Sequence, residues 1–208
     1  MPLYKTITPN SQTTVKIWKI SESCDELLNA ITLKPENVRR VLGMKSELHQ
    51  KGFLSVRHLL AEFGYQDTDL YYDTNGKPHL KDGKYISITH SYTFSAVVVS
   101  NYVVGIDVEK QRDKIAMIAH KFIDYEFDYL NEEDVDYIKK LTTIWCVKES
   151  LYKLFATPGL SFKEHCLVIP FTFEEPSTTA WIDYENKKHG YKINFLEFEG
   201  FTCAYALA

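Results

Sequence analysis

The sequence predicts an α+β fold of two similar lobes, each an antiparallel sheet packed with helices, with the active site in the cleft between them. Three observations lead to this prediction. Runs of alternating apolar and polar residues indicate strands, apolar residues at helical spacing indicate helices, and both kinds of segment recur in the same order along the two halves of the chain. We therefore expect an N-terminal lobe over residues 1–102 and a C-terminal lobe over residues 103–208.

The first half opens with a strand and continues with helices. Residues 15–20 (V-K-I-W-K-I) alternate apolar and polar side chains, which predicts a strand with one buried face. Residues 27–40 read as a helical stretch that is interrupted near Pro35. Apolar residues recur at helical spacing over residues 47–63, and Gly64 is well suited to end that helix.

The rest of the first half is extended. Residues 70–72 lead into a D-T-N-G-K-P run, whose Asn75-Gly76 pair is a strong signal for a hairpin turn. Two strands are expected at residues 85–89 and 94–100, joined by a turn at residues 90–92.

The second half repeats this order. Residues 103–108 predict a strand, and residues 115–130 and 141–156 predict helices, the latter closed by Pro158-Gly159. The remaining chain predicts short strands at residues 166–169, 180–184, 191–198 and 201–206.

A weak internal repeat supports two similar halves. Residues 53–64 (FLSVRHLLAEFG) align with residues 144–155 (IWCVKESLYKLF) at an offset of 91 residues, and the first strands of the two halves are about 90 residues apart. Any two amphipathic helices share some of this pattern, so the repeat alone does not establish a duplication. If the duplication is real, a site between the halves is natural and a monomer is expected.

Composition excludes several classes of protein. Hydrophobic residues make up 45% of the 208 residues, which is enough for a buried core, and 24 Lys plus Arg against 28 Asp plus Glu give a net charge of −4. A general nucleic-acid-binding protein is usually basic, so we expect no nucleic-acid partner. The N-terminal residues lack the long apolar stretch of a signal peptide or membrane span, which predicts a cytoplasmic protein with no membrane partner.

The four cysteines indicate neither a disulfide framework nor a zinc site. Cys24, Cys146, Cys166 and Cys203 contain no C-x-x-C pair and have no histidines at zinc-site spacing. We expect buried free thiols in a reducing compartment.

Two acids in the strand that opens the second half are candidate metal ligands. Asp107 and Glu109 are two residues apart, so in a strand they share a face, with Cα atoms about 6.6 to 6.8 Å apart. Adjacent acids repel each other, and a shared hard cation is the usual remedy. The alternative is a solvated strand face on which the acids are spaced by chance.

The helix over residues 141–156 carries a third acid. Glu149 and Lys153 are at i and i+4, so both project from one helix face. Such a pair is often a surface device that contributes only about 0.2–0.5 kcal/mol. The aromatic and aliphatic side chains of Trp145, Leu151 and Tyr152 crowd this pair, however, and charged groups with little free surface need a partner.

Polar residues at the end of the predicted strand 85–89 are candidate phosphate ligands. Thr89, His90 and Ser91 supply two hydroxyls and an imidazole, and a turn adds backbone N–H donors. They can equally be ordinary turn residues. Lys77 lies between Gly76 and Pro78, where a tight turn presents a cation rigidly. Neither a glycine-rich phosphate loop nor a G-x-S-x-G nucleophile motif is present in the sequence.

Taken in order, these motifs resemble the 4′-phosphopantetheinyl transferase superfamily, in particular its larger two-lobed type, which activates peptide and polyketide synthases. The family's (V/I)-G-(I/V)-D-x-E strand is matched by residues 104–109, and its W-x-x-K-E-(S/A)-x-x-K helix by residues 145–153. Its G-K-P turn is matched by residues 76–78 and its S-H-S-like segment by residues 89–91, so the likeness covers residues 76–153.

The resemblance implies a substrate pair and a site. Coenzyme A would be the donor, a serine of an apo acyl or peptidyl carrier protein the acceptor, and adenosine 3′,5′-bisphosphate the second product, in fatty acid, polyketide or nonribosomal peptide biosynthesis. Mg²⁺ would be bound by Asp107, Glu109 and Glu149, and Lys153 would neutralise the coenzyme's pyrophosphate. The residues implied in holding coenzyme A, several of them in the N-terminal lobe, are Arg40, Lys77, Thr89, His90, Lys148 and Lys153, with His90 the candidate for the 3′-phosphate.

The implied chemistry fits the residues. The carrier serine attacks phosphorus, so the enzyme needs no nucleophile of its own, and its tasks are positioning, charge neutralisation and proton removal. Glu149 is the candidate general base, either directly or through a metal-bound water, unless it serves only as a metal ligand. Because carrier proteins are usually acidic, docking needs a local basic or apolar patch; candidates are Arg112, Lys114, Met117, Lys121 and Phe122.

Two other readings use the same residues. A Mg²⁺-dependent phosphodiesterase or nuclease would use these acids, but it would need a basic footing for nucleic acid and often a second metal. A degenerate, non-catalytic interaction module is the other reading. Intact acids on both the strand and the helix speak against it.

Overall fold

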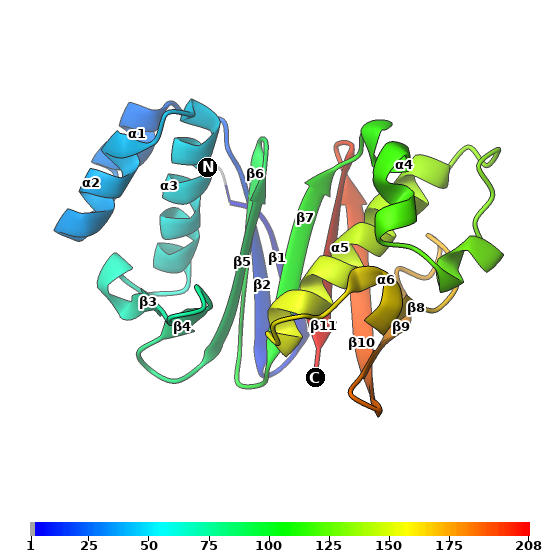
Figure 1. The fold of residues 1–208 in the computed structure, drawn as a ribbon. Coiled ribbons are helices and arrows are strands. Elements are labelled where there is room, and N and C mark those ends of the chain that lie inside the picture. Colours follow the sequence, from blue (N-terminus) through cyan, green and yellow to red (C-terminus); the bar gives the residue numbers. More distant parts are fainter. Residues whose placement is uncertain (1–2) are drawn as a thin grey trace. The chain divides into compact units, whose positions relative to one another are not determined.

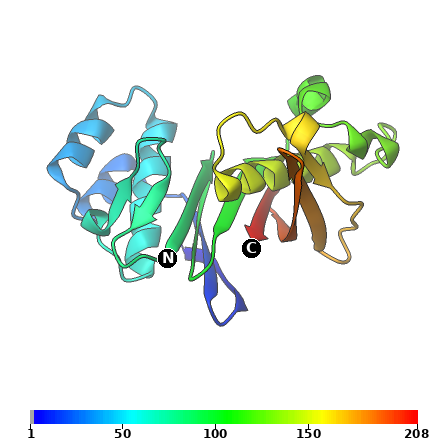
Figure 2. The same cartoon turned by 60° about the horizontal axis from the view of Figure 1, so that its bottom comes forward.

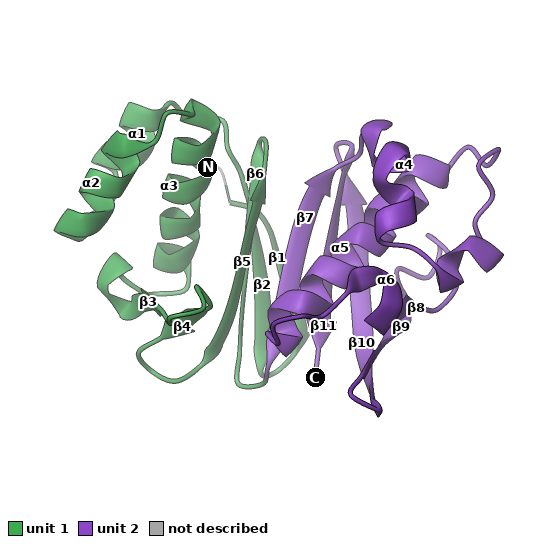
Figure 3. Ribbon diagram, viewed as in Figure 1, with its two compact units in different colours: residues 1–102 green, residues 103–208 purple. Residues whose placement is uncertain are grey.

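The computed structural model describes residues 3–208 (Figure 1), which form two compact units divided between residues 102 and 103, called unit 1 and unit 2 (Figure 3). Each unit is a mixed α/β body whose antiparallel sheet packs against helices, so the predicted α+β class is confirmed. Among the described residues, no helix combines the length and the apolar character that crossing a membrane requires.

Unit 1 is built on a four-stranded antiparallel sheet in the order β1-β2-β6-β5. Helix α3 packs on β6, β5 and β2, and α1 and α2 pack on α3. The elements are β1 (Leu3–Asn10), β2 (Thr13–Lys19), α1 (Cys24–Asn29), α2 (Pro35–Gly43), α3 (Glu47–Glu62), η1 (Asp67–Asp69), β3 (Leu70–Tyr72), β4 (Pro78–Leu80), β5 (Tyr85–Ser91) and β6 (Phe94–Ser100).

Local sequence signals explain most of these boundaries. Pro35 begins α2, where its fixed φ suits the first helical position. The Ser46 side chain caps α3 by accepting a hydrogen bond from the backbone N–H of His49, and Gly64, with φ +84°, follows its end as predicted. The Asn75-Gly76 turn lies between β3 and β4, so the predicted hairpin is confirmed.

Two features of unit 1 differ from the prediction. Strand β1 was not predicted, because its side chains alternate only weakly in polarity and most of them are exposed. His90 and Ser91 belong to β5, where they pair with Ser95 and Phe94, so the turn to β6 falls at residues 92–93 instead of 90–92. Tyr92, with φ +50°, takes up the turn.

Unit 2 is a five-stranded antiparallel sheet in the order β7-β11-β10-β9-β8, crossed on one face by the long helix α5 (Figure 2). Helix α5 packs on β7, β11 and β8. The elements are β7 (Val104–Lys110), α4 (Lys114–Ile118), η2 (Ala119–Lys121), η3 (Tyr125–Asp128), α5 (Tyr137–Phe155), α6 (Phe162–His165), β8 (Cys166–Val168), β9 (Ser177–Tyr184), β10 (Lys187–Phe198) and β11 (Phe201–Leu207).

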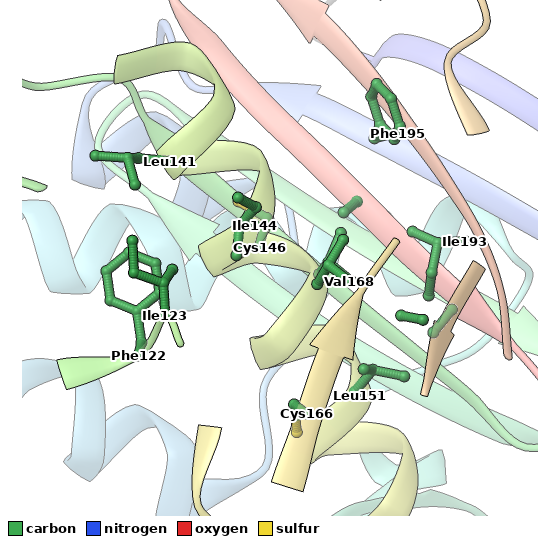
Figure 4. Close-up of a cluster of buried hydrophobic side chains, with 14 of the residues drawn as sticks. Phe122, Ile123, Leu141, Ile144, Cys146, Leu151, Cys166, Val168, Ile193 and Phe195 are labelled. Atoms are coloured by element: carbon green, nitrogen blue, oxygen red, sulfur yellow. The ribbon is translucent and has the colours of Figure 1, made fainter. Parts of the chain in front are cut away.

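The core of unit 2 lies between α5 and the sheet. Leu141, Ile144 and Leu151 of α5 gather with Val168 of β8 and Ile193 of β10 (Figure 4), and each is 0% exposed. Burying an aliphatic side chain of this size contributes about 1.5–3 kcal/mol, so this cluster fixes α5 on the sheet. A separate cluster, which includes Leu54, Leu59, Leu60 and Val97, forms the core of unit 1.

The segment between β7 and α5 is where the prediction of unit 2 is wrong. One helix was expected over residues 115–130, but the chain forms the short helices α4, η2 and η3. The side chains of Phe122, Ile123 and Glu126 are at most 1% exposed, and their burial overrides helical propensity. Phe122 is therefore not the surface contact that the sequence predicted.

The cysteines agree with the expectation of free thiols. All four are free, and Cys146, Cys166 and Cys203 are buried, whereas Cys24 is half-buried. Burial raises the pKa of the Cys146 thiol well above its ordinary value, so this group stays protonated at neutral pH.

Candidate functional site

Strand β7 presents two carboxylates on one face of the unit 2 sheet. Asp107 pairs with Ala204 of β11 and Glu109 with Thr202, so both acids lie on the face that α5 covers together with Ala204. Asp107 is 4% exposed and Glu109 is half-buried. A buried carboxylate at this position needs a positive or hydrogen-bonding partner.

Gly105 allows α5 to reach this face. A Cβ atom at position 105 would lie 2.8 Å from the carbonyl carbon of Ser150, closer still to its oxygen, and 3.1 Å from Cβ of Leu154. Only glycine leaves room for the helix backbone here. The Ser150 hydroxyl is 2.7 Å from the carbonyl oxygen of Cys146 and 2.9 Å from that of Ala204, so it donates within the helix or to β11.

Lys153 supplies the partner of Asp107. Its Nζ donates to Oδ1 of Asp107 at 2.7 Å and to the carbonyl oxygen of Ile106 at 3.0 Å. Burial lowers the pKa of Lys153, but the charge and hydrogen bond of Asp107 outweigh it, so the pKa is raised overall. Lys153 is therefore a cation held at the β7 carboxylates, with 28% of its side chain still exposed.

Glu149 lies one helical turn before Lys153 and within electrostatic range of both strand acids. Burial, followed by the charge of Asp107, raises the pKa of Glu149 to about 7, with Glu109 adding to the rise and Lys153 opposing it. Three carboxylates and one lysine are thus electrostatically coupled on one face of unit 2. A carboxyl group with a pKa near neutrality can bind or release a proton under physiological conditions.

The carboxylates of Asp107, Glu109 and Glu149 are the candidate ligands for Mg²⁺. Among the described residues, no group of three or more His, Cys, Asp or Glu side chains is gathered closely enough to hold a metal ion. Mg²⁺ takes few protein ligands, prefers carboxylate oxygens and completes its shell with water and substrate phosphate. Burial and then repulsion by Asp107 raise the pKa of Glu149, and a cation would relieve that repulsion, so Asp107, Glu109 and Glu149 fit Mg²⁺ by type of donor and by charge.

Lys148 lies away from this cluster. Its Nζ is 2.8 Å from Oε1 of Glu126 and donates to the carbonyl oxygens of Phe122 at 2.7 Å and Phe162 at 3.1 Å. Both charged side chains are 0% exposed. This geometry does not support the predicted contact of Lys148 with coenzyme A, because its ammonium group is occupied inside the protein.

In unit 1, the packing of His90 depends on a glycine of α3. A Cβ atom at Gly52 would lie 2.7 Å from Nδ1 and 2.8 Å from Cγ of His90, so the imidazole lies directly against the helix backbone. The ring centroid of His49 is 6.5 Å away. His90 is exposed, and the neighbouring Thr89 is 7% exposed.

The other unit 1 residues predicted to bind the coenzyme lie on separate elements. Arg40 is exposed in the last turn of α2, with its guanidinium 5.2 Å from the centre of the Phe53 ring. Lys77 lies in the β3–β4 turn, where its backbone N–H donates to Oδ1 of Asp73 at 2.9 Å. This hydrogen bond fixes the turn, in which Lys77 is half-buried.

Sequence reasoning missed Gly52 and Glu126. A lone glycine inside a helical pattern commonly has a packing reason, so Gly52 could have been noticed. Glu126 gave no such signal, because an acid among aromatic residues in a predicted amphipathic helix reads as its solvated face.

Comparison with known proteins shows the family of the chain. Residues 103–206, which contain Asp107, Glu109, Glu149 and Lys153, match the 4′-phosphopantetheinyl transferase superfamily. Over 133 residues, which are 62% of this chain, the sequence is 27% identical to 4′-phosphopantetheinyl transferase gsp of Aneurinibacillus migulanus. The match spans 54% of the relative's length, or about half. Because the family model matches half of the length of this chain, the chain belongs to the 4′-phosphopantetheinyl transferase superfamily.

Proposed function

We propose that the chain is a 4′-phosphopantetheinyl transferase that moves the phosphopantetheine group of coenzyme A to a serine of an apo carrier protein. Adenosine 3′,5′-bisphosphate is the second product. The observation that carries this proposal is the coupling of Asp107, Glu109, Glu149 and Lys153 on one face of unit 2. This set supplies what phosphoryl transfer needs, namely oxygen donors for a cation, one fixed positive charge and a titratable carboxyl group.

Asp107, Glu109 and Glu149 would hold Mg²⁺. When bound, the ion supplies charge neutralisation at the pyrophosphate of the coenzyme. Asp107 is fixed for this role by Lys153, which occupies one of its oxygens and orients the carboxylate. Lys153 itself faces the place where negative charge grows on the leaving phosphate, and it stabilises that charge.

Glu149 receives the proton of the attacking serine. Its raised pKa gives it affinity for a proton at neutral pH, which an ordinary surface glutamate lacks. A bound cation would lower that pKa, so base strength and metal binding oppose each other at this residue. The transferase therefore needs a half-buried Glu149, since full exposure would remove the shift.

Arg40, Lys77, Thr89 and His90 contribute to coenzyme binding from unit 1. His90 is the strongest candidate of the four, because its imidazole ring packs directly against the α3 backbone at Gly52 and an imidazole can bind a phosphate. Lys148 is not part of this proposed set. The placement of the site in a cleft, the monomeric state and the cytoplasmic location stay predictions from the sequence.

The partner is an acidic carrier protein. Arg112, Lys114 and Lys121 are exposed around α4, and Met117 is 66% exposed between them. Basic groups beside an apolar side chain match an acidic protein that also offers an apolar contact. This surface follows β7 directly in the chain, so it begins a few residues from Asp107 and Glu109.

The deciding experiment is incubation of the protein with coenzyme A, Mg²⁺ and an apo carrier protein, followed by intact mass spectrometry. We expect the carrier to gain the mass of phosphopantetheine and adenosine 3′,5′-bisphosphate to appear. The Glu149→Gln variant should lose this transfer while keeping its melting temperature, because the neutral amide removes a charge that is costly to bury. Near-normal turnover of this variant would refute the three-carboxylate site.

The same incubation separates the two alternatives. A phosphodiesterase would cleave coenzyme A or a nucleic acid without adding mass to the carrier. A non-catalytic interaction module would bind the carrier and release no adenosine bisphosphate.

A further inference from the structure

We propose that the buried pair of Lys148 and Glu126 is a positioning device that holds the face of α5 carrying Glu149. The pair would act on catalysis through Glu149 and its neighbours, without touching substrate. The kinetic part of this inference rests on the proposed transferase function.

Lys148 has a complete set of internal partners. The ammonium group has three N–H donors, and Glu126, the Phe122 carbonyl and the Phe162 carbonyl supply three acceptors at 2.8, 2.7 and 3.1 Å. These acceptors come from three different segments, namely η3, the residue after η2, and α6. One side chain of α5 therefore binds two backbone carbonyls and one carboxylate, which come from three different segments.

Glu126 extends this connection to the sheet. Its Oε1 also accepts from the backbone N–H of Val168 in β8 at 2.9 Å, and its Oε2 accepts from that of Asp124 at 3.2 Å. The pair thus joins α5, the segment before it, α6 and the edge strand β8. Burial lowers the pKa of Lys148 while Glu126 opposes that effect, as expected for an ammonium group that is buried together with its counter-ion.

The carbonyls that Lys148 holds belong to two phenylalanines whose rings pack on aromatic side chains of α5. The Phe122 ring packs edge-on against Trp145 at 5.0 Å, and the Phe162 ring packs against Trp145 at 5.6 Å and Tyr152 at 5.8 Å. Trp145 and Tyr152 lie at i−4 and i+3 from Glu149, so they stand on the same side of α5. By holding the backbone of Phe122 and Phe162, Lys148 therefore fixes the rings that pack against Trp145 and Tyr152, on the side of α5 that carries Glu149; we call these four rings the aromatic walls.

Stability alone does not account for this pair. Taking two charges out of water costs about as much as their attraction returns, and an apolar pair of similar volume is often as stable. What this ion pair adds is direction, because the ammonium group donates its three N–H groups to acceptors on three different segments. The segment 119–128 adopts irregular turns in place of a regular helix, and Glu126 points inward from it.

The test uses the double variant Glu126→Gln/Lys148→Met, which removes both charges and leaves no lone buried ion. We expect its melting temperature to stay within about 4 °C of the wild type. We expect kcat to fall at least about tenfold, because a small misplacement of a catalytic group has this effect, and KM for coenzyme A to change less than about twofold. The indole N–H resonance of Trp145, assigned with Trp145→Phe, should shift.

A matched control is Lys140→Met. Lys140 is also on α5 and also pairs with acids, Asp134 at 2.9 Å and Asp136 at 3.0 Å, but near the helix start. We expect this variant to leave both kinetic constants and the Trp145 resonance unchanged. The singles Glu126→Gln and Lys148→Met should each lower kcat, and their effects should not add, because they break one device.

Three outcomes would overturn the proposal. A rise in KM for coenzyme A in Lys148→Met but not in Glu126→Gln would show that Lys148 contacts the coenzyme. Unfolding of the double variant would show that the pair serves folding. An unmoved Trp145 resonance in the double variant would show that the aromatic walls do not depend on the pair. This last readout needs no activity, so it judges the positioning role even if the wild type transfers nothing to a carrier.

Discussion

The ammonium group of Lys153 lies 2.7 Å from Oδ1 of Asp107, which joins helix α5 to strand β7 by a charged hydrogen bond beside Glu149. Charged hydrogen bonds of this length are about twice as strong as neutral ones. Lys153 donates at the same time to the backbone carbonyl of Ile106, so its position is set by two acceptors. The Lys153 ammonium group thus supplies part of the positive charge that a metal ion would supply at Asp107.

Replacing Lys153 by methionine should weaken the protein and inactivate it. Asp107 would keep its buried charge without this partner, which we expect to cost about 1–3 kcal/mol of unfolding free energy. Mg²⁺ should raise the melting temperature of Lys153→Met more than that of the wild type, because the ion can take over the role of the lost ammonium group. Equal Mg²⁺ effects on both proteins, measured by thermal denaturation with Ca²⁺ and Na⁺ as comparisons, would contradict binding at Asp107.

A methyl group at position 105 should separate α5 from β7. Gly105→Ala places Cβ against the Ser150 carbonyl, so the helix must shift, and we expect a loss of about 1–3 kcal/mol together with loss of transfer. Gly43→Ala is the matched control, because no atom lies within 4 Å of a Cβ at Gly43, at the end of α2. Urea denaturation of the two variants tests this contrast, and similar stabilities would contradict the close approach.

Stability should decline as the pH rises from about 4.5 to 7 because of Glu197. Burial raises its folded pKa to about 7, although hydrogen bonds from Thr202 and Gln111 act in the opposite direction. In that window the unfolded chain gives up the proton while the folded chain keeps it, so the folded state binds more protons and loses stability with rising pH. Above about pH 7 Glu197 is ionised in both the folded and the unfolded chain, so it no longer makes the free energy of unfolding depend on pH.

Glu197→Gln should make this decline smaller, the rest coming from Glu149, whose pKa burial also raises to about 7, and it should be more stable than the wild type at pH 8, by about 1 kcal/mol. Melting temperatures across the pH range measure the effect. Glu174→Gln, at an exposed position, is the control and should leave the pH profile of the wild type intact. A Glu197→Gln profile that matches the wild type would show that Glu197 is ionised in the folded protein.

Reversing the charge of the α4 surface should weaken carrier docking alone. The double variant Lys114→Glu/Lys121→Glu should raise KM for the carrier about tenfold, because it sets acids against an acidic partner, and leave the affinity for coenzyme A unchanged. Lys187→Glu, exposed on β10, is a control of equal type. Steady-state kinetics with each substrate varied in turn would decide, and equal changes for both substrates would argue against this docking surface.

The sequence predicted the regular elements well because their signals are local. Alternation predicted β2, extended apolar runs predicted β5, β6 and β7, and Gly64 predicted the end of α3. The strand order β2-β6-β5 with α3 and the order β7-β11-β10 with α5 are alike, which supports the predicted duplication. The duplication itself stays a prediction.

The parts that the sequence did not predict depend on distant partners. The expected helix over residues 115–130 gives way because Glu126 turns inward to Lys148, which lies 22 positions further along the chain. No sequence pattern near Glu126 predicts its pairing with Lys148. The same contact explains why Lys148, which the motif suggested as a coenzyme ligand, is withdrawn into the core.

The close approach of Gly105 to Ser150 limits how this part of the protein can diverge. The strand motif and the helix motif are some forty residues apart in the chain, yet here the backbone of β7 at Gly105 lies against the backbone of α5 at Ser150. The helix side of this gap is the backbone carbonyl of Ser150, so only a displaced helix could make room for a side chain at position 105, which is already at the minimum. That carbonyl is present whatever residue occupies position 150, so position 105 should stay glycine in related sequences even where the residue at 150 varies.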